Sequence, residues 1–214
     1  MNRRRTIVSR LSVFSTLLLC ALLVGLISGT AANPRQEIYR LAELMQWKAG
    51  TIVADIGAGD GSFGFAAAEI VGTSGRVYAT EIDTDKLKQL RADVVKRKLT
   101  NVVVVDGAAD DTKLPTVCCD AIYLRHVYHH ITEPAEFDKN LVRSLKPGAR
   151  LAIIDFPPNG NLEPVEGVPK NRGGHGIPQE VMVDELTSAG LHVEKVVSDW
   201  SGNDYCVVFV KRGP

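Results

Sequence analysis

Cysteine motifs and a charge imbalance are both missing from this sequence. The four cysteines, at positions 20, 118, 119 and 206, form no Cys-X-X-Cys pair, so neither a cysteine zinc site nor a disulfide framework is indicated. Lys and Arg together number 25, as do Asp and Glu, which leaves no net charge to attract nucleic acid. No tyrosine is followed by lysine four positions later, so the Tyr-X-X-X-Lys pair of many nicotinamide-dependent oxidoreductases is absent.

The N-terminus differs from the rest of the chain. Four arginines occur in "MNRRRTIVSR", and residues 11–27, "LSVFSTLLLCALLVGLI", then run without a charge. The small residues of "SGTAAN" follow. This pattern is typical of a secretory signal or of a single membrane anchor. We therefore assign residues 1–32 to a signal peptide or N-terminal membrane anchor, and residues 33–214 to one domain.

From Asn33 onward, apolar runs rich in β-branched residues alternate with segments of helical periodicity. Such alternation predicts an α/β domain whose mostly parallel sheet is covered by helices on both faces. Two final runs predict antiparallel strands, so the expected fold is a doubly wound three-layer sandwich of seven strands with the last one antiparallel. The expected helices are 33–47, 61–72, 83–98, 133–148 and 178–190, and the expected strands are 51–56, 75–82, 101–107, 118–126, 149–156, 191–200 and 204–212.

The stretch "VADIGAGDGSFGF", residues 53–65, follows the first predicted strand. Gly59, Gly61 and Gly64 fit G-X-G-X-X-G, the fingerprint of a dinucleotide pyrophosphate site. However, Asp55 would then lie close to a dianionic pyrophosphate, which is unfavourable. A sulfonium nucleoside tolerates the carboxylate, because the ligand carries positive charge.

The order of motifs resembles that of the class I methyltransferases that depend on S-adenosylmethionine (SAM). Residues 55–61 match the family's D-X-G-X-G-X-G loop at each fixed position, and "VYATEID", "VVVVDGAADDTKLP", "CDAIYLRHVYHHI" and "LVRSLKPGARLAIIDF" resemble its later strand motifs. The likeness covers residues 45 to 156 and is greatest to the small-molecule group that includes quinone methyltransferases.

This resemblance implies SAM as the cofactor and a Rossmann-like methyltransferase fold. Glu81 stands where the family binds the ribose hydroxyls, and Asp106 where it meets the adenine amine, with Ala108 near the ring. The complete set of cofactor-binding residues implied is Asp55, Gly57, Ala58, Gly59, Gly61, Glu81, Ile82, Asp106, Gly107, Ala108 and Arg125.

Three of the five histidines fall in "RHVYHHI", directly after the fourth predicted strand and hence at the ligand edge of the sheet. We predict His126, the nearest to the strand end, as a catalytic base for an acceptor that must lose a proton. Tyr128 and His130 are predicted to line the acceptor pocket. His129 and His130 also have an ordinary explanation as packing or capping residues.

A metal site is the alternative use of these histidines, with His126, His130, His175 and Asp155 as possible ligands for zinc or iron. Since His-X-X-His spacing is common without a metal, we predict no metal ion.

Residues 157–178 form a Pro-, Gly- and Asn-rich segment without an apolar period. Loops of this length are commonly lids or binding loops, and His175 is predicted to close over the acceptor. Lys170 and Arg172 either recognise an acidic acceptor or face water.

The sequence thus predicts transfer of a methyl group from SAM to a small-molecule or lipid-like acceptor. The predicted location, exported or membrane-anchored through residues 11–27, conflicts with a cofactor made in the cytosol. Two other functions stay open at this point: a nicotinamide-dependent oxidoreductase, and an exported binding protein with the same fold. Nothing in the sequence indicates a nucleic-acid partner, and the oligomeric state is not predicted.

Overall fold

The computed structural model describes residues 33–213. The predicted N-terminal signal or anchor, including residues 11–27, lies outside the described residues. Within residues 33–213, none of the helices combines the length and apolar character that a membrane span requires. The elements are α1 (Pro34–Leu44), β1 (Ile52–Ile56), α2 (Ser62–Val71), β2 (Arg76–Glu81), α3 (Thr84–Lys96), β3 (Val102–Asp106), β4 (Cys119–Arg125), η1 (Tyr128–His130), α4 (Pro134–Ser144), β5 (Leu145–Asp155), η2 (Lys170–Arg172), α5 (Gln179–Ser188), β6 (His192–Ser201) and β7 (Asp204–Val210).

The strands form one seven-stranded sheet in the order β3-β2-β1-β4-β5-β7-β6. β7 runs antiparallel to both of its neighbours, and the pairs from β3 to β5 are parallel. The predicted fold class is confirmed. The chain order reverses between β1 and β4, and in doubly wound sheets a ligand binds beyond the carboxyl ends of the strands at this switch point.

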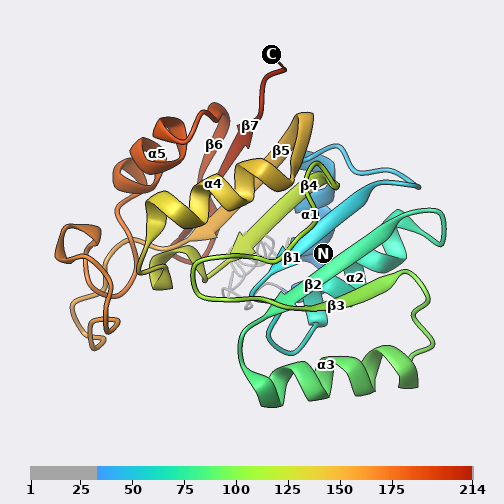
Figure 1. The fold of residues 1–214 in the computed structure, drawn as a ribbon. Coiled ribbons are helices and arrows are strands. Elements are labelled where there is room, and N and C mark those ends of the chain that lie inside the picture. Colours follow the sequence, from blue (N-terminus) through green and yellow to red (C-terminus); the bar gives the residue numbers. More distant parts are fainter. Residues whose placement is uncertain (1–32, 214) are drawn as a thin grey trace, which may run out of the picture. The chain divides into compact units, whose positions relative to one another are not determined.

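Helices cover both faces of the sheet, with α4 and α5 on one side and α1 and α2 on the other (Figure 1). Alternation along the strands separates two apolar clusters: Val53 and Tyr123 pack on the α1–α2 side, whereas Ala54 and Ile122 pack on the α4–α5 side. Because both faces are buried, the central strands are mostly apolar, with Asp55 as a buried exception in β1.

Local signals in the sequence set the helix ends. Asn33 caps α1 by accepting a hydrogen bond from the Arg35 N–H, and Pro34 occupies the first turn. Asp83 caps α3 by accepting from the N–H groups of Asp85 and Lys86. These side chains satisfy backbone donors that a helix N-terminus leaves without partners.

The segment from 157 to 178 is tied to the domain by Arg172, whose side chain is buried. Its guanidinium donates to the carbonyl oxygens of Ile131 and Tyr128 and to the Glu185 carboxylate. The expectation that Arg172 recognises an acceptor or faces water is therefore wrong. Its charge is used internally because buried arginine requires partners.

We expect Gly61→Ala to destabilise the domain more than Gly202→Ala. Both glycines have positive φ, +78° and +58°, so a side chain costs about 1–2 kcal/mol at either position. A Cβ at Gly61 would also lie 2.4 Å from Phe65 Cζ and 2.7 Å from Leu90 Cδ2, whereas Gly202 has open space. Overpacking adds about 1–3 kcal/mol. Urea unfolding of the two variants measures the difference; equal losses would contradict this packing argument.

Candidate cofactor and acceptor site

A cavity of about 700 Å³ opens at the carboxyl ends of β1, β2 and β4. Its size lies within the usual range for small-molecule sites, about 300–1,000 Å³. Of the residues predicted from the sequence, those that line it are Gly57, Glu81, Ile82, Gly107, Ala108, Arg125, His126 and His130. The parallel strands bring these residues together because their carboxyl ends meet at one edge of the sheet.

Glu81, the last residue of β2, connects two loops at this edge. One carboxylate oxygen accepts from the Gly59 N–H at 3.0 Å, and the other accepts from the Ile82 and Asp83 N–H groups at 2.8 and 3.1 Å. The side chain is nearly buried yet borders the cavity. Since a carboxylate offers about four acceptor positions, room remains for a ligand hydroxyl.

In the glycine loop after β1, Gly57 is tightly packed against the protein, whereas Gly59 has open space beside its backbone. Val127 packs against Gly57, where a Cβ would lie 2.5 Å from Val127 Cγ2. At Gly59, by contrast, the nearest heavy atom to a Cβ would be a backbone oxygen 4.0 Å away. A ligand can therefore approach the backbone at Gly59, whereas Gly57 is already required by the protein itself.

Five predicted cofactor residues do not line the cavity, and two of them, Asp55 and Asp106, are carboxylates with other surroundings. Asp55 is buried beneath α2, and its pKa is raised to about 7, mainly by burial. The nearby Tyr123 hydroxyl and Gly64 N–H oppose this shift only in part. Asp106 pairs with Arg91 on α3 and is largely exposed. Neither carboxylate is among the groups that line the cavity, and neither are Ala58, Gly59 and Gly61; at the end of β3, Gly107 and Ala108 line it instead.

His126 directly follows β4 and has a left-handed backbone, φ +55°. Its Nε2 lies 2.7 Å from an Asp204 carboxylate oxygen, and its Nδ1 lies 3.3 Å from an Arg125 guanidinium nitrogen. Since guanidinium only donates, the neutral ring carries its proton on Nε2 and a lone pair on Nδ1. Strained backbone of this kind costs about 1–3 kcal/mol and occurs preferentially at functional sites.

The remaining site histidines form a separate group. Ring nitrogens of His129, His130 and His175 lie within 4.8 Å of one another, and His129 Nδ1 lies 2.8 Å from Asp155 Oδ1. Partial burial, together with the two neighbouring rings, lowers the pKa of His130 to about 4. The alternative cluster considered from the sequence contained His126, but His126 turns to Asp204 and His129 takes its place.

Tyr128 does not line the acceptor pocket as predicted. It is fully buried, and its hydroxyl lies within hydrogen-bond distance of the Asp138 and Glu185 carboxyl groups, at 2.9 and 3.0 Å. The 3-10 turn of η1 places its ring in the α4–α5 core. Nearness to the end of β4 did not predict where the Tyr128 side chain lies, because successive residues of the turn point in different directions.

Sequence reasoning missed Asp204, the partner of His126. A signal was available: an antiparallel strand begins where its parallel neighbours end, so the first residue of β7 lies at the ligand edge. Asp155, the last residue of β5, is paired with Tyr205 in the sheet, which confirms this register.

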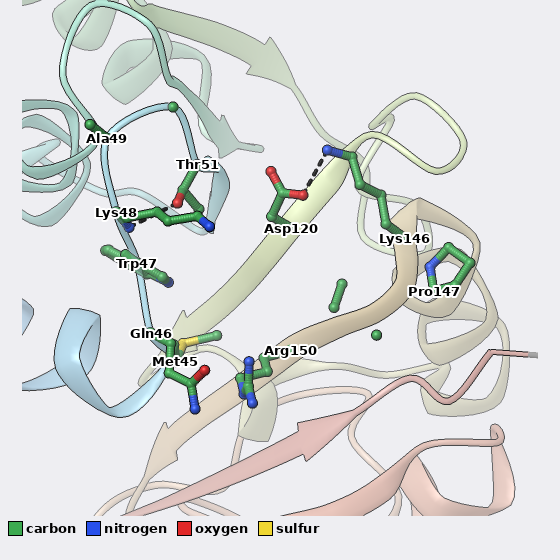
Figure 2. A pocket seen from close by; sticks show the side chains of 13 residues that line it. Met45, Gln46, Trp47, Lys48, Ala49, Thr51, Asp120, Lys146, Pro147 and Arg150 are labelled. Carbon is green, nitrogen blue, oxygen red and sulfur yellow. Dashed lines mark hydrogen bonds and ion pairs between the residues drawn. The ribbon is translucent and has the colours of Figure 1, made fainter.

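A second cavity, of about 450 Å³, lies at the amino ends of β1, β4 and β5. Figure 2 shows its side chains, including the Lys146–Asp120 ion pair and the hydrogen bond from the Lys48 N–H to Thr51. None of the predicted cofactor or catalytic residues lines it.

Comparisons with known proteins agree on the class. Residues 54–153 match the family described as "Methyltransferase domain". A ubiquinone/menaquinone biosynthesis C-methyltransferase of Pseudomonas putida is 29% identical over 115 residues, which are 53% of this chain and 45% of that protein. The chain thus matches about half the length of this curated relative.

Solved structures match over more of the chain. A SAM-dependent methyltransferase from Aquifex aeolicus is 26% identical with a TM-score of 0.70, covering 85% of this chain and 94% of that one. A possible exported protein from Bordetella parapertussis shares the fold at 14% identity and a TM-score of 0.65, with 84% and 67% covered.

The strand order, the glycine loop and the acidic end of β2 define a class I methyltransferase domain. The matched domain and the solved structures support a class I methyltransferase that depends on SAM, with SAM as its cofactor. The alternative of a nicotinamide-dependent oxidoreductase is accordingly wrong. The G-X-G-X-X-G match begins at Gly59, two residues after Gly57, which is the first glycine of the methyltransferase loop.

The raised pKa of Asp55 predicts that stability falls as pH rises. Between the ordinary value of 3.8 and about 7, the folded protein holds a proton that the unfolded chain releases. The free energy of unfolding therefore decreases with pH across this window. Asp138, with a pKa also raised to about 7 by burial, acts in the same direction.

We expect Asp55→Asn to reduce the decline in stability between pH 5 and pH 8, because the amide does not titrate. Chemical unfolding at several pH values tests this expectation, with Asp138→Asn as the parallel variant and the double variant expected to show the smallest decline. An unchanged pH dependence in Asp55→Asn would show that Asp55 is ionised throughout.

Proposed function

We propose that this protein transfers a methyl group from SAM to a small-molecule or lipid-like acceptor. The observation that carries the proposal is the Glu81 carboxylate, fixed by three backbone N–H groups at the wall of a ligand-sized cavity. The His126–Asp204 pair borders the same cavity. A cofactor bound by Glu81 and a base at His126 would therefore lie at the same edge of the sheet.

The cavity suits the cofactor chemically. The free acceptor position on Glu81 fits a ribose hydroxyl, and Ile82, Gly107 and Ala108 offer an apolar wall for the adenine ring. The open backbone at Gly59 allows close approach of the amino-acid part. When bound, SAM supplies an electrophilic methyl group on a sulfonium.

His126 would prepare the acceptor. Its Nδ1 lone pair can take a proton from an acceptor O–H or acidic C–H group after displacing the Arg125 contact at 3.3 Å. Asp204 at 2.7 Å would stabilise the imidazolium that results. Alignment of acceptor and methyl group provides the remaining catalysis.

The class of acceptor is inferred from the cavity and from relatives. Ile131, Val127 and Phe137 contribute an apolar part to the lining, which suits an apolar ring or chain. The relative from Pseudomonas putida is named for quinone biosynthesis. An exported or membrane-anchored location would also favour an apolar acceptor.

We expect Glu81→Gln to weaken SAM binding by about 1.5–3 kcal/mol, roughly 10- to 150-fold in Kd. The amide presents donors to backbone N–H groups that need an acceptor, and it weakens the bond to the ribose. Calorimetric titration of the full chain measures the change. Glu69→Gln, on the exposed side of α2, is the matched control. Absence of SAM binding in the unmodified protein would favour the non-catalytic binding protein instead.

For His126→Gln we expect methyl transfer to fall by about 10²–10⁴-fold, the usual contribution of a general base, with the Kd for SAM nearly unchanged. Asp204→Asn should lower the rate less, because the imidazole remains. The assay follows labelled methyl from SAM into quinols, phenolic lipids and water-soluble phenols. His192→Gln, on an exposed strand position, should keep full activity. A His126→Gln variant as active as the unmodified protein would exclude this base, and transfer to water-soluble phenols alone would exclude a lipid-like acceptor.

A further inference from the structure

The group formed by His129, His130 and His175 combines residues far apart in the sequence. His129 and His130 lie in η1, after β4, whereas His175 belongs to the long segment that follows β5. One ring nitrogen from each lies within 4.8 Å of the other two. The ring centroid of His129 lies 4.1 Å from that of His130 and 5.2 Å from that of His175.

His129 has a buried nitrogen without a partner. Its side chain is 1% exposed, its Nδ1 contacts Asp155, and its Nε2 has no hydrogen-bond partner among the described residues. Buried polar atoms are nearly always satisfied, and exceptions point to a missing ion or other ligand. Nothing in the catalytic arrangement of His126 uses this nitrogen.

The outer partners of two rings are those expected of metal ligands. His129 Nδ1 lies 2.8 Å from the Asp155 carboxylate, and His175 Nδ1 lies 2.8 Å from the Glu163 carbonyl oxygen. Metal-binding histidines generally donate one ring N–H to a carboxylate or carbonyl, which directs the other nitrogen to the ion. In both residues Nε2 is therefore the nitrogen left for a ligand role.

The buried Asp155 carboxylate beside His129 is an electrostatic reason to expect a cation at this group of histidines. Its side chain is fully buried, and its hydrogen-bond donors within the described residues are His129 and the Phe156 N–H. No lysine or arginine of residues 33–213 forms an ion pair with it. Buried charges are normally paired or coordinate a metal, and a dication on His129 would balance this carboxylate.

We propose that His129, His130 and His175 bind one divalent transition-metal ion of the zinc type, with Asp155 and the Glu163 carbonyl as outer hydrogen-bond partners. Neutral imidazole suits zinc, copper, iron and nickel better than calcium or magnesium. Tetrahedral Zn–N bonds of about 2.0–2.1 Å place the ligand nitrogens about 3.3 Å apart. The largest distance between ring nitrogens in the group, 4.8 Å, would therefore have to shorten by about 1.5 Å on metal binding.

Three protein ligands characterise catalytic rather than structural zinc sites, because the fourth position is left to water or a substrate atom. His130 lines the cavity proposed for cofactor and acceptor, so the fourth position adjoins the acceptor side. The sequence analysis grouped His126, rather than His129, with the other two histidines, and it predicted no metal because His-X-X-His spacing is common without one.

The test uses the full chain without a histidine tag, freed of metal by a chelator that is then removed. Calorimetric titration with ZnCl₂ should show one site per chain, and CoCl₂ should give the visible absorption of tetrahedral Co²⁺. We expect His130→Ala and His175→Ala each to weaken Zn²⁺ binding by about 100-fold or more, and Asp155→Asn by about 10- to 100-fold.

His192→Ala is the matched control and should bind Zn²⁺ as the unmodified protein does, since His192 is exposed on β6. Circular dichroism checks that each variant is folded; His130 and His175 are at least partly exposed, so their replacement spares the core. No Zn²⁺ binding by the folded protein would overturn the proposal. The proposal would also be overturned if His130→Ala and His175→Ala both bound Zn²⁺ as tightly as the unmodified protein, or if His192→Ala lost Zn²⁺ binding.

The metal proposal stands independently of methyl transfer. SAM titrated into the metal-free protein reports on the cofactor site alone, and ZnCl₂ titrated in the absence of SAM reports on the histidines alone. Failure of one titration leaves the other result intact.

Discussion

The contact of Glu81 with three backbone N–H groups organises the ligand edge of this protein. It joins the loop after β1 to the loop after β2, although 22 residues separate Gly59 from Glu81. A carboxylate accepting several N–H bonds is a charge-assisted arrangement stronger than ordinary neutral hydrogen bonds. The cavity takes its shape from this connection, because Gly57 and Ile82 on either side both line it.

Buried carboxylates are used in different ways across the sheet. Among residues 33–213, Asp55 forms no ion pair, and burial raises its pKa to about 7. Asp138 receives the Tyr128 hydroxyl, but burial still raises its pKa to about 7. Asp155 is paired with His129 instead. Within residues 33–213, Asp55 Oδ2 and His129 Nε2 are both buried without a hydrogen-bond partner. The pair of Asp155 with His129 differs because its partnerless atom is an imidazole nitrogen close to two further histidine rings.

The short segment after β4 divides its histidines between two tasks. The left-handed backbone of His126 turns its ring towards Asp204 on β7. The 3-10 turn that follows directs His129 and His130 towards His175. Phe156 lies between the two groups, with ring centroids 5.3 Å from His126 and 4.8 Å from His129. A base and a metal site can therefore coexist at one edge without sharing a ligand.

The sheet, its antiparallel last strand and the family loop could be predicted from the sequence, because they depend on local periodicity and on motifs within short stretches. Helix caps are also local, since Asn33 and Asp83 accept hydrogen bonds from backbone N–H groups two or three residues later. The family resemblance also identified Glu81, at the end of the second predicted strand.

Tertiary structure alone decided which side chains meet. Asp204 reaches His126 over 78 residues, and His175 reaches the η1 histidines from a segment without periodicity. Tyr128 and Arg172 were misassigned for the same reason: their partners lie on α4 and α5, outside the short stretch from which each residue was interpreted. Local patterns fix where a strand ends, but the direction of a side chain in the following loop depends on packing between elements, which no short stretch of sequence encodes.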